Sequence, residues 1–336
     1  MYIPVLYFQN YGNCSILSGI GLTVAERLLT EHPGLRLCLA CRNKTRAQAA
    51  LDALQLSHPT AQISIVIVDT SNIKSVYNAV TEIKKMYSHI DYLYLNAGIM
   101  QVVGVDWNYF WKTLFTKNFI HMFTTGDGLL KEQEEITEEN LEKVFTTNVF
   151  GHFVLIKELE SVLINGTRPS QIIWTSSSNA QKHHFSLENI QHRNERGGHY
   201  SSSKYSTDLL SLALNERLNN KGVYSHVTCP GLVMTNLTFG ILPSWFWNLI
   251  LPIFWLLRIF VPTMNYDTYN GSEALVWLSK QKPESLDPMC KYVSHCNFIG
   301  KRYVHQHKLK IDQEDANQLY NQLNTLENKF HQKYKS

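Results

Sequence analysis

The feature that most constrains this chain is the alternation of short apolar runs with longer amphipathic stretches. The runs are rich in β-branched residues, as buried strands are, and the stretches between them have helical periodicity. The strand-like runs are 35–40, 63–69, 90–98, 170–177, 223–231 and 291–298. The helix-like stretches are 22–32, 46–56, 72–87, 138–164 and 201–220. This order predicts a Rossmann-like α/β fold, in which helices cover a doubly wound parallel sheet.

Composition removes one class of partner. The 336 residues carry 31 Lys and Arg against 28 Asp and Glu, which leaves a net charge of +3. The sequence has no long basic block and no basic stripe interleaved with aromatic residues. We therefore do not expect the protein to bind nucleic acid.

Cysteine and histidine give no clear metal signal. The 6 cysteines are scattered along the chain, which suits a reducing compartment better than a disulfide framework. Cys38 and Cys41 have CxxC spacing, but they lie in a run that reads as a buried strand, so we interpret them as core residues. The remaining candidate ligands are interpreted as surface histidines, and no metal is expected. They are His183, His184, His305 and His307.

Polar and small residues follow the ends of the strand-like runs. A doubly wound sheet binds its ligand beyond the carboxyl ends of its strands, so functional residues should stand there. They are Arg42, Asp69, Asn96 to Gly98, Ser176 with Ser177, and Pro230 with Gly231.

Tyr200 and Lys204 lie four residues apart and thus on one face of a helix. This pair alone is a weak signal. It stands in order with Gly19-Ile20-Gly21, LNAG, TNVFG, a serine run and CPG. The ordered set resembles the short-chain dehydrogenase/reductase family, over residues 19 to about 310. Longer strings such as LNAGIM, TNVFGHF and NLTFGILP are similar to the sterol-ketone reductases of that family.

The resemblance implies roles for a catalytic set. Tyr200 would protonate a ketone oxygen, with Lys204 lowering the pKa of that phenol and hydrogen-bonding the nicotinamide ribose. Ser177 would orient the substrate carbonyl. Asn148 would support a water that links the lysine to solvent. Ser186 is a second candidate for the substrate-binding serine.

The cofactor expected from this resemblance is NADPH. No acidic residue follows the run 35–40, at the position where NAD enzymes of this fold carry one; Arg42, followed by Asn43, can hold a 2′-phosphate instead. The resemblance implies that further residues contact the cofactor. These residues are Ser18, Gly19, Ile20, Gly21, Asp69, Asn96, Ala97, Gly98 and Thr235.

The N-terminus departs from the family pattern. Counting back from Gly19 puts Ser15 where the first glycine of the turn belongs and Cys14 where a threonine belongs. Residues 2–8 could be the first strand, but Pro4 would remove a hydrogen-bond donor from the most central strand. We expect instead that residues 1–15 replace a lost strand, which would weaken cofactor binding.

Residues 239–257 form an uncharged stretch rich in Trp and Phe. Two prolines and an asparagine interrupt it, so we expect a lid or a monotopic membrane anchor, with a buried helix pair as the alternative. A second apolar insertion at 105–123 would border the same entrance. We expect one catalytic domain over 1–310 and a helical tail over 311–336.

The resemblance thus implies an NADPH-dependent reductase of zymosterone-type 3-keto sterols, with the 17-keto group of estrone as a second target. It would face the cytosol on the endoplasmic reticulum membrane, contact lipid, and associate with itself or with sterol-demethylation enzymes. A membrane-associated scaffold with an impaired cofactor turn is the first alternative. A soluble reductase of small ketones is the second.

Overall fold

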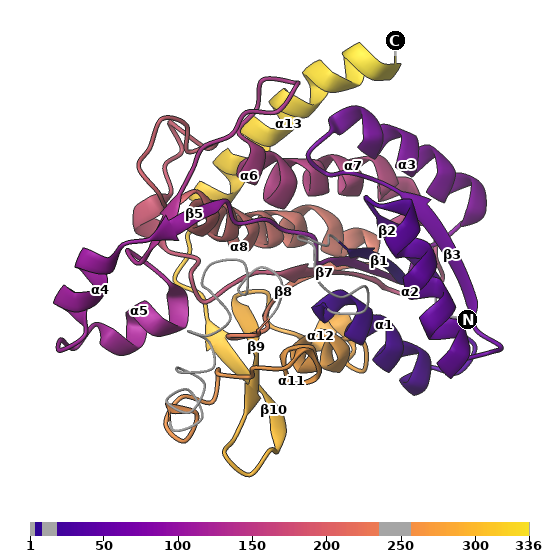
Figure 1. The fold of residues 1–336 in the computed structure, drawn as a ribbon. Coiled ribbons are helices and arrows are strands. Elements are labelled where there is room, and N and C mark those ends of the chain that lie inside the picture. The colour runs from indigo at the N-terminus through magenta and orange to yellow at the C-terminus, as the bar shows by residue number, and fades with distance from the viewer. Residues whose placement is uncertain (1–3, 9–18, 235–256, 336) are drawn as a thin grey trace.

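An eight-stranded sheet forms the centre of the protein (Figure 1). The computed structural model describes residues 4–8, 19–234 and 257–335. Along the sheet the strand order is β10-β9-β8-β7-β4-β1-β2-β3, and β10 alone of the eight described strands runs antiparallel to its neighbour. The strands are β1 (Pro4–Phe8), β2 (Arg36–Cys41), β3 (Gln62–Ile67), β4 (Tyr92–Leu95), β7 (Ser170–Thr175), β8 (Val223–Cys229), β9 (Cys290–Cys296) and β10 (Arg302–Lys308). The doubly wound sheet is confirmed.

The expectation of a lost first strand is wrong. β1 lies between β2 and β4 and pairs in parallel with both. Pro4 is the first residue of the strand, and pairing with β2 begins only at Val5. A proline at the start of a strand removes a donor where the ladder is ending, so the central position is tolerated.

Helices cover both faces of the sheet (Figure 1). One buried cluster joins the sheet to α3, α7, α8 and α13, and the other joins it to α1, α2 and α12. The helices are α1 (Ile20–Glu31), α2 (Lys44–Ser57), α3 (Ile73–Met86), α6 (Lys143–Phe145), α7 (Gly151–Leu163), α8 (His199–Leu218), α11 (Thr268–Gly271), α12 (Glu273–Leu278) and α13 (Gln313–Lys335). The predicted C-terminal helix is α13, which packs against α8 through side chains of the main core such as Leu319 and Leu323.

Cys38 and Cys41 are buried in β2 as free thiols, as the sequence predicts for core residues. Burial raises the pKa of the Cys38 thiol to about 11 and that of Cys41 to about 12. Neutral thiols of this kind are inert packing groups.

An insertion follows β4 and leaves the main sheet. It contains the two-stranded sheet of β5 (Val102–Val105) and β6 (Leu130–Glu132), with α4 (Trp107–Thr113) and α5 (Phe119–Thr125) between them. Helix α4 projects at the left edge of the molecule in Figure 1, and several of its large apolar side chains are exposed. The sequence predicts an apolar insertion here but not its hairpin.

Several predictions fall on residues outside the described ranges. Ser18, Thr235 and nearly all of 239–257 are among them. Among the described residues, no helix combines the length and apolar character that crossing a bilayer requires.

Strand order reverses between β1 and β4. At such a switch point the loops at the carboxyl ends diverge and leave a crevice for a ligand. Gly19 and Ile20 begin α1 on one side of this point, and Asn96 to Gly98 follow β4 on the other. The fold therefore gathers the described site residues beyond the carboxyl ends of the central strands.

Candidate active site

Tyr200 lies in the first turn of α8, which begins at His199 directly after Gly197 and Gly198. Gly198 has φ +82°, a conformation that residues with a side chain rarely adopt, and a Cβ there would clash with the His184 ring. The Tyr200 amide donates to Glu132 Oε2 of β6 at 3.3 Å. The insertion after β4 therefore contacts the start of α8 and fixes the backbone position of Tyr200.

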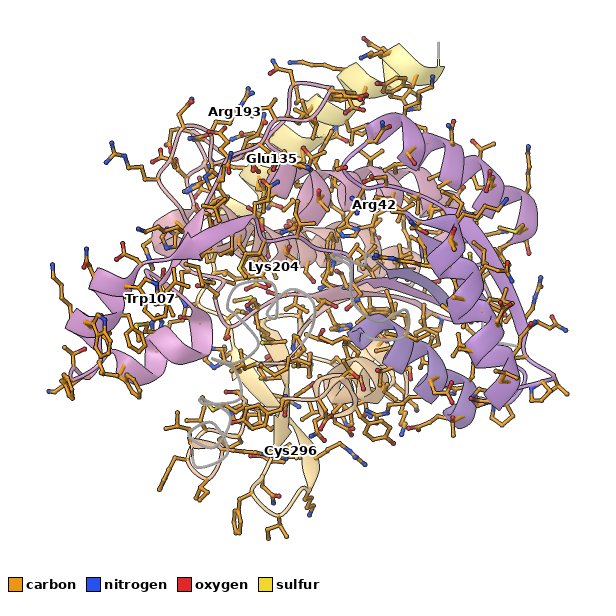
Figure 2. All side chains as sticks on the ribbon, in the orientation of Figure 1. Arg42, Trp107, Glu135, Arg193, Lys204 and Cys296 are labelled. Atoms are coloured by element: carbon orange, nitrogen blue, oxygen red, sulfur yellow. The ribbon has the colours of Figure 1, made fainter. Side chains whose placement is uncertain are left out.

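Lys204 follows one turn later and is only 4% exposed. Its ammonium lies 5.6 Å from the centre of the Tyr200 ring and donates to the Thr175 carbonyl at 2.7 Å. Figure 2 shows Lys204 near the middle of the molecule, with Arg42 to its right. The tyrosine and lysine that the sequence pairs are thus neighbours in the structure.

The structure distinguishes the candidate serines. Ser177 forms a hydrogen bond with the Tyr200 side chain, whereas the Ser176 hydroxyl donates to Asp208 Oδ1 at 2.6 Å. Ser186 instead donates to Glu188 two residues on and accepts from the amide of that residue, in a local turn. Ser177 therefore meets the phenol, and the alternative role of Ser186 finds no support in its contacts.

Asn148 lies in a π-helical turn, Thr146–Phe150, that interrupts the single helix predicted over 138–164. Its side chain accepts from the Ile99 amide at 2.7 Å and donates to the Ile99 carbonyl at 3.0 Å and to Ser203 Oγ at 2.9 Å. Turns of this kind are frequent at functional sites. Asn148 therefore joins the loop after β4 to α8, beside Lys204.

Burial dominates the protonation of the pair. It raises the pKa of Tyr200 to about 12, although the hydrogen bond with Ser177 acts in the opposite direction. It also lowers the pKa of Lys204 to about 8, with Asp208 opposing that change. Burial is the largest influence on the Tyr200 pKa in this structure, and it acts against the lowering expected from Lys204. A protonated phenol is nevertheless the form that a proton donor needs.

At the other end of the crevice, Arg42 follows β2 and Asp69 follows β3. Arg42 Nη1 lies 3.9 Å from Asp69 Oδ2, and both side chains are partly exposed. Asp69 Oδ1 also accepts from the amide and hydroxyl of Ser71. Asn43 caps α2 by accepting from the Arg46 amide at 3.0 Å. The structure thus brings Arg42 and Asp69 together, while Asn43 serves the helix.

The loop after β4 has the close approach that a dinucleotide site needs. A Cβ on Gly98 would lie 3.2 Å from Lys204 Nζ and 3.4 Å from Asn148 Oδ1, so a larger residue would crowd the site. Asn96 accepts from Thr175 Oγ1 at 3.0 Å, and the Ala97 carbonyl contacts His152 Nε2 at 2.9 Å. With the start of α1 opposite and Arg42 at the end of β2, these residues fit a nicotinamide dinucleotide.

Two residues of this region are absent from the sequence interpretation. Asp208 lies on the same face of α8 as Tyr200 and Lys204, four residues beyond the lysine, and Lys291 stands in the apolar run of β9. Their charged groups are 2.7 Å apart and buried. A charge inside each predicted buried element is a signal that could have found them.

A short-chain dehydrogenase family model matches residues 16–242. The chain is 52% identical over 310 residues to the "3-keto-steroid reductase/17-beta-hydroxysteroid dehydrogenase 7" of Rattus norvegicus, covering 92% of each chain. It is 50% identical over 310 residues to the protein of the same name from Homo sapiens, covering 92% of this chain and 91% of that one.

Among solved structures, an NADPH-bound short chain oxidoreductase from Pseudomonas aeruginosa aligns with a TM-score of 0.57 at 17% identity, covering 84% of this chain and 91% of that one. At this identity the likeness supports the fold alone. Together with the sheet order and the matched family model, these similarities establish that the chain belongs to the short-chain dehydrogenase/reductase family, an oxidoreductase family that uses NAD or NADP.

Proposed function

We propose that this protein reduces the 3-keto group of a steroid or sterol to a hydroxyl, using NADPH. The observation that carries the proposal is the identity of 52% and 50%, over 92% of this chain, with proteins named for that activity. The same names include a 17-beta-hydroxysteroid dehydrogenase. We therefore propose a 17-keto steroid such as estrone as a second substrate.

Four side chains would carry the reaction. Tyr200 keeps its proton at neutral pH, because burial raises its pKa to about 12, and it would donate that proton to the ketone oxygen. Ser177, in contact with the phenol, would hold the same oxygen in place. Lys204 would stabilise the phenolate that remains. Asn148 would order the loop after β4 and support a path for proton resupply.

The cofactor supplies the hydride that reduces the ketone carbon. Arg42 favours NADPH over NADH, because its guanidinium stands at the end of β2 beside Asp69 and can pair with a 2′-phosphate. The Ala40-Cys41-Arg42-Asn43 sequence offers no carboxylate for a ribose hydroxyl at this position.

We further propose that the protein works on the endoplasmic reticulum membrane, where a lipid ketone would be dissolved. Support comes from the exposed aromatic side chains of the insertion, including Trp111 at 62% and Phe115 at 90% exposure. Apolar surface of this kind is costly in water and suits a lipid boundary.

The alternative of a scaffold with an impaired cofactor turn is weakened because β1 is in the sheet, while Cys14 and Ser15 of that turn lie outside the described residues. A soluble reductase of small ketones is the remaining competitor. Each alternative predicts a different outcome in an assay of purified protein.

The test uses the purified full chain with NADPH and three ketones: a 3-keto sterol, estrone and a small aromatic ketone. We expect conversion of the 3-keto sterol to its 3-hydroxy product, with faster turnover from NADPH than from NADH. Turnover of only the small ketone would overturn the substrate class, and failure of the folded chain both to bind NADPH and to turn over any ketone would favour the scaffold.

A further inference from the structure

We propose that Lys291 and Asp208 form a positioning pair that fixes Ser177 and controls the charge of Lys204. The pair lies beneath the candidate active site, one residue on β9 and the other on α8. This inference rests on the proposed function, because it assigns work to Ser177 and Lys204.

The geometry is a clamp on the end of β7. Lys291 Nζ lies 2.7 Å from Asp208 Oδ2 and donates to the Ser177 carbonyl at 2.8 Å. The other oxygen of the same carboxylate accepts from Ser176 Oγ at 2.6 Å. One buried ion pair therefore holds both the backbone of Ser177 and the side chain of the residue before it.

Both residues of the pair are buried, so a contribution to stability alone does not explain why they are charged. Lys291 is 5% exposed and Asp208 is 2% exposed, and the desolvation of two charges commonly offsets much of their attraction. Such a pair is weak support for stability, but it is directional. Each hydrogen-bonding atom of the clamp restricts Ser177, whose hydroxyl must meet both Tyr200 and a substrate oxygen.

The same pair sets the electrostatic surroundings of Lys204. The charged and titratable groups that face its ammonium are Tyr200 and Asp208 of α8, Lys291 of β9, Cys229 of β8 and His152 of α7. Asp208 raises the pKa of Lys204, whereas Lys291 lowers it, and burial brings the pKa to about 8. Glu132 of β6 acts on the neighbouring Tyr200.

The pair therefore predicts shifts of opposite sign. Asp208→Asn removes the carboxylate that keeps Lys204 charged, so the pKa of Lys204 should fall further and activity should be lost at a lower pH. Lys291→Met removes a like charge, so the pKa should rise and activity should persist to a higher pH. We expect each variant to move the alkaline limb by about half a pH unit or more.

Two readouts are measured against pH with the purified full chain. The first is the rate of reduction of the 3-keto sterol. The second is the dissociation constant of NADPH from its fluorescence, which follows the charge of Lys204 without requiring turnover. Thermal unfolding of each variant shows whether it is folded.

A double variant, Asp208→Asn with Lys291→Met, protects the test from misfolding, because it leaves neither charge buried alone. We expect it to unfold near the wild-type temperature, with an alkaline limb between those of the single variants. Its rate of reduction should fall by about tenfold, the loss expected for one hydrogen bond that orients Ser177.

Asp91→Asn is the matched control. Asp91 is also buried and lies 2.9 Å from Arg168, but it precedes β4 at the opposite end of the sheet. It should lower the unfolding temperature and leave both pH profiles unchanged.

The outcomes separate this inference from the proposed function. If Tyr200→Phe abolishes reduction but the Asp208→Asn, Lys291→Met and double variants keep the wild-type pH profiles, the positioning pair is refuted and the function stands. If Tyr200→Phe reduces the ketone normally, the proposed function itself fails. Shifts of the same sign in both single variants would also refute the pair.

Discussion

The two ends of the crevice are built differently. Around Tyr200 and Lys204, polar side chains from the π-helical turn, α8 and β9 are buried and bonded to partners far away in the sequence. Around Arg42 and Asp69, the side chains are partly exposed. Asp69 accepts its hydrogen bonds from Ser71, only two residues away in the sequence. The end around Tyr200 and Lys204 is thus part of the folded core, whereas the end around Arg42 and Asp69 is a partly exposed, charged surface.

This difference teaches which properties a substitution should change. A buried hydrogen-bonded group leaves an unsatisfied partner when it is removed, so its loss affects both stability and geometry. A partly exposed charge can be removed with little effect on folding, so its loss affects ligand affinity and its dependence on salt.

Asn148→Ala should have the largest effect on stability. It removes the partner of both backbone groups of Ile99, so we expect the free energy of unfolding to fall by about 2–4 kcal/mol. Urea denaturation measures this loss. The control is Asn72→Ala, which removes a partly buried helix cap on α3 and should cost about 1 kcal/mol. Equal losses for the two variants would erase the distinction between the ends.

Arg42→Ala should act on affinity alone. Loss of a charge-assisted bond to the 2′-phosphate should raise the KM for NADPH by about 10- to 100-fold, with kcat unchanged and less change for NADH. The effect should shrink as salt is added. Arg36→Ala, at the amino end of the same strand, is the matched control. An equal rise for NADPH and NADH would show that Arg42 does not read the phosphate.

Ser177→Ala should slow reduction by about tenfold, the value of one neutral hydrogen bond. Steady-state kinetics with the 3-keto sterol measures it. Ser186→Ala is the control, because its hydroxyl is engaged with Glu188 and should not affect the rate. A slower rate for Ser186→Ala, with the wild-type rate for Ser177→Ala, would identify Ser186 as the substrate-binding serine.

The smallest effect on folding is expected outside the crevice. Trp111→Ser should change the free energy of unfolding by less than about 0.5 kcal/mol, because the side chain is exposed. It should weaken association with phospholipid vesicles, as measured by flotation. Leu56→Ser, an exposed apolar residue on α2, should leave flotation unchanged. Equal flotation of both variants would argue against a lipid contact at α4.

The sequence predicts the parallel sheet, because buried strands and amphipathic helices differ in period and length. It also predicts Tyr200, Lys204, Asn148 and Ser177, because their motifs stand in the order of the family that the sequence resembles. A local sequence pattern does not show that the pairing of β1 with two neighbouring strands outweighs the hydrogen-bond donor lost at Pro4. That is why β1 was expected to be lost.

Tertiary contacts explain the remaining differences. Asp208 and Lys291 are 83 residues apart in the sequence, so their pairing depends on β9 lying beside β8, under α8. The protonation of Tyr200 depends on burial, which the YxxxK spacing does not report. The hairpin of β5 and β6 likewise depends on pairing across two intervening helices.

The central claim is that Tyr200 protonates the ketone. The most direct test is Tyr200→Phe, assayed for formation of the 3-hydroxy sterol and for NADPH binding in the same preparation. We expect a loss of rate of at least about 100-fold with NADPH affinity retained. Reduction at the wild-type rate by the folded variant would contradict it.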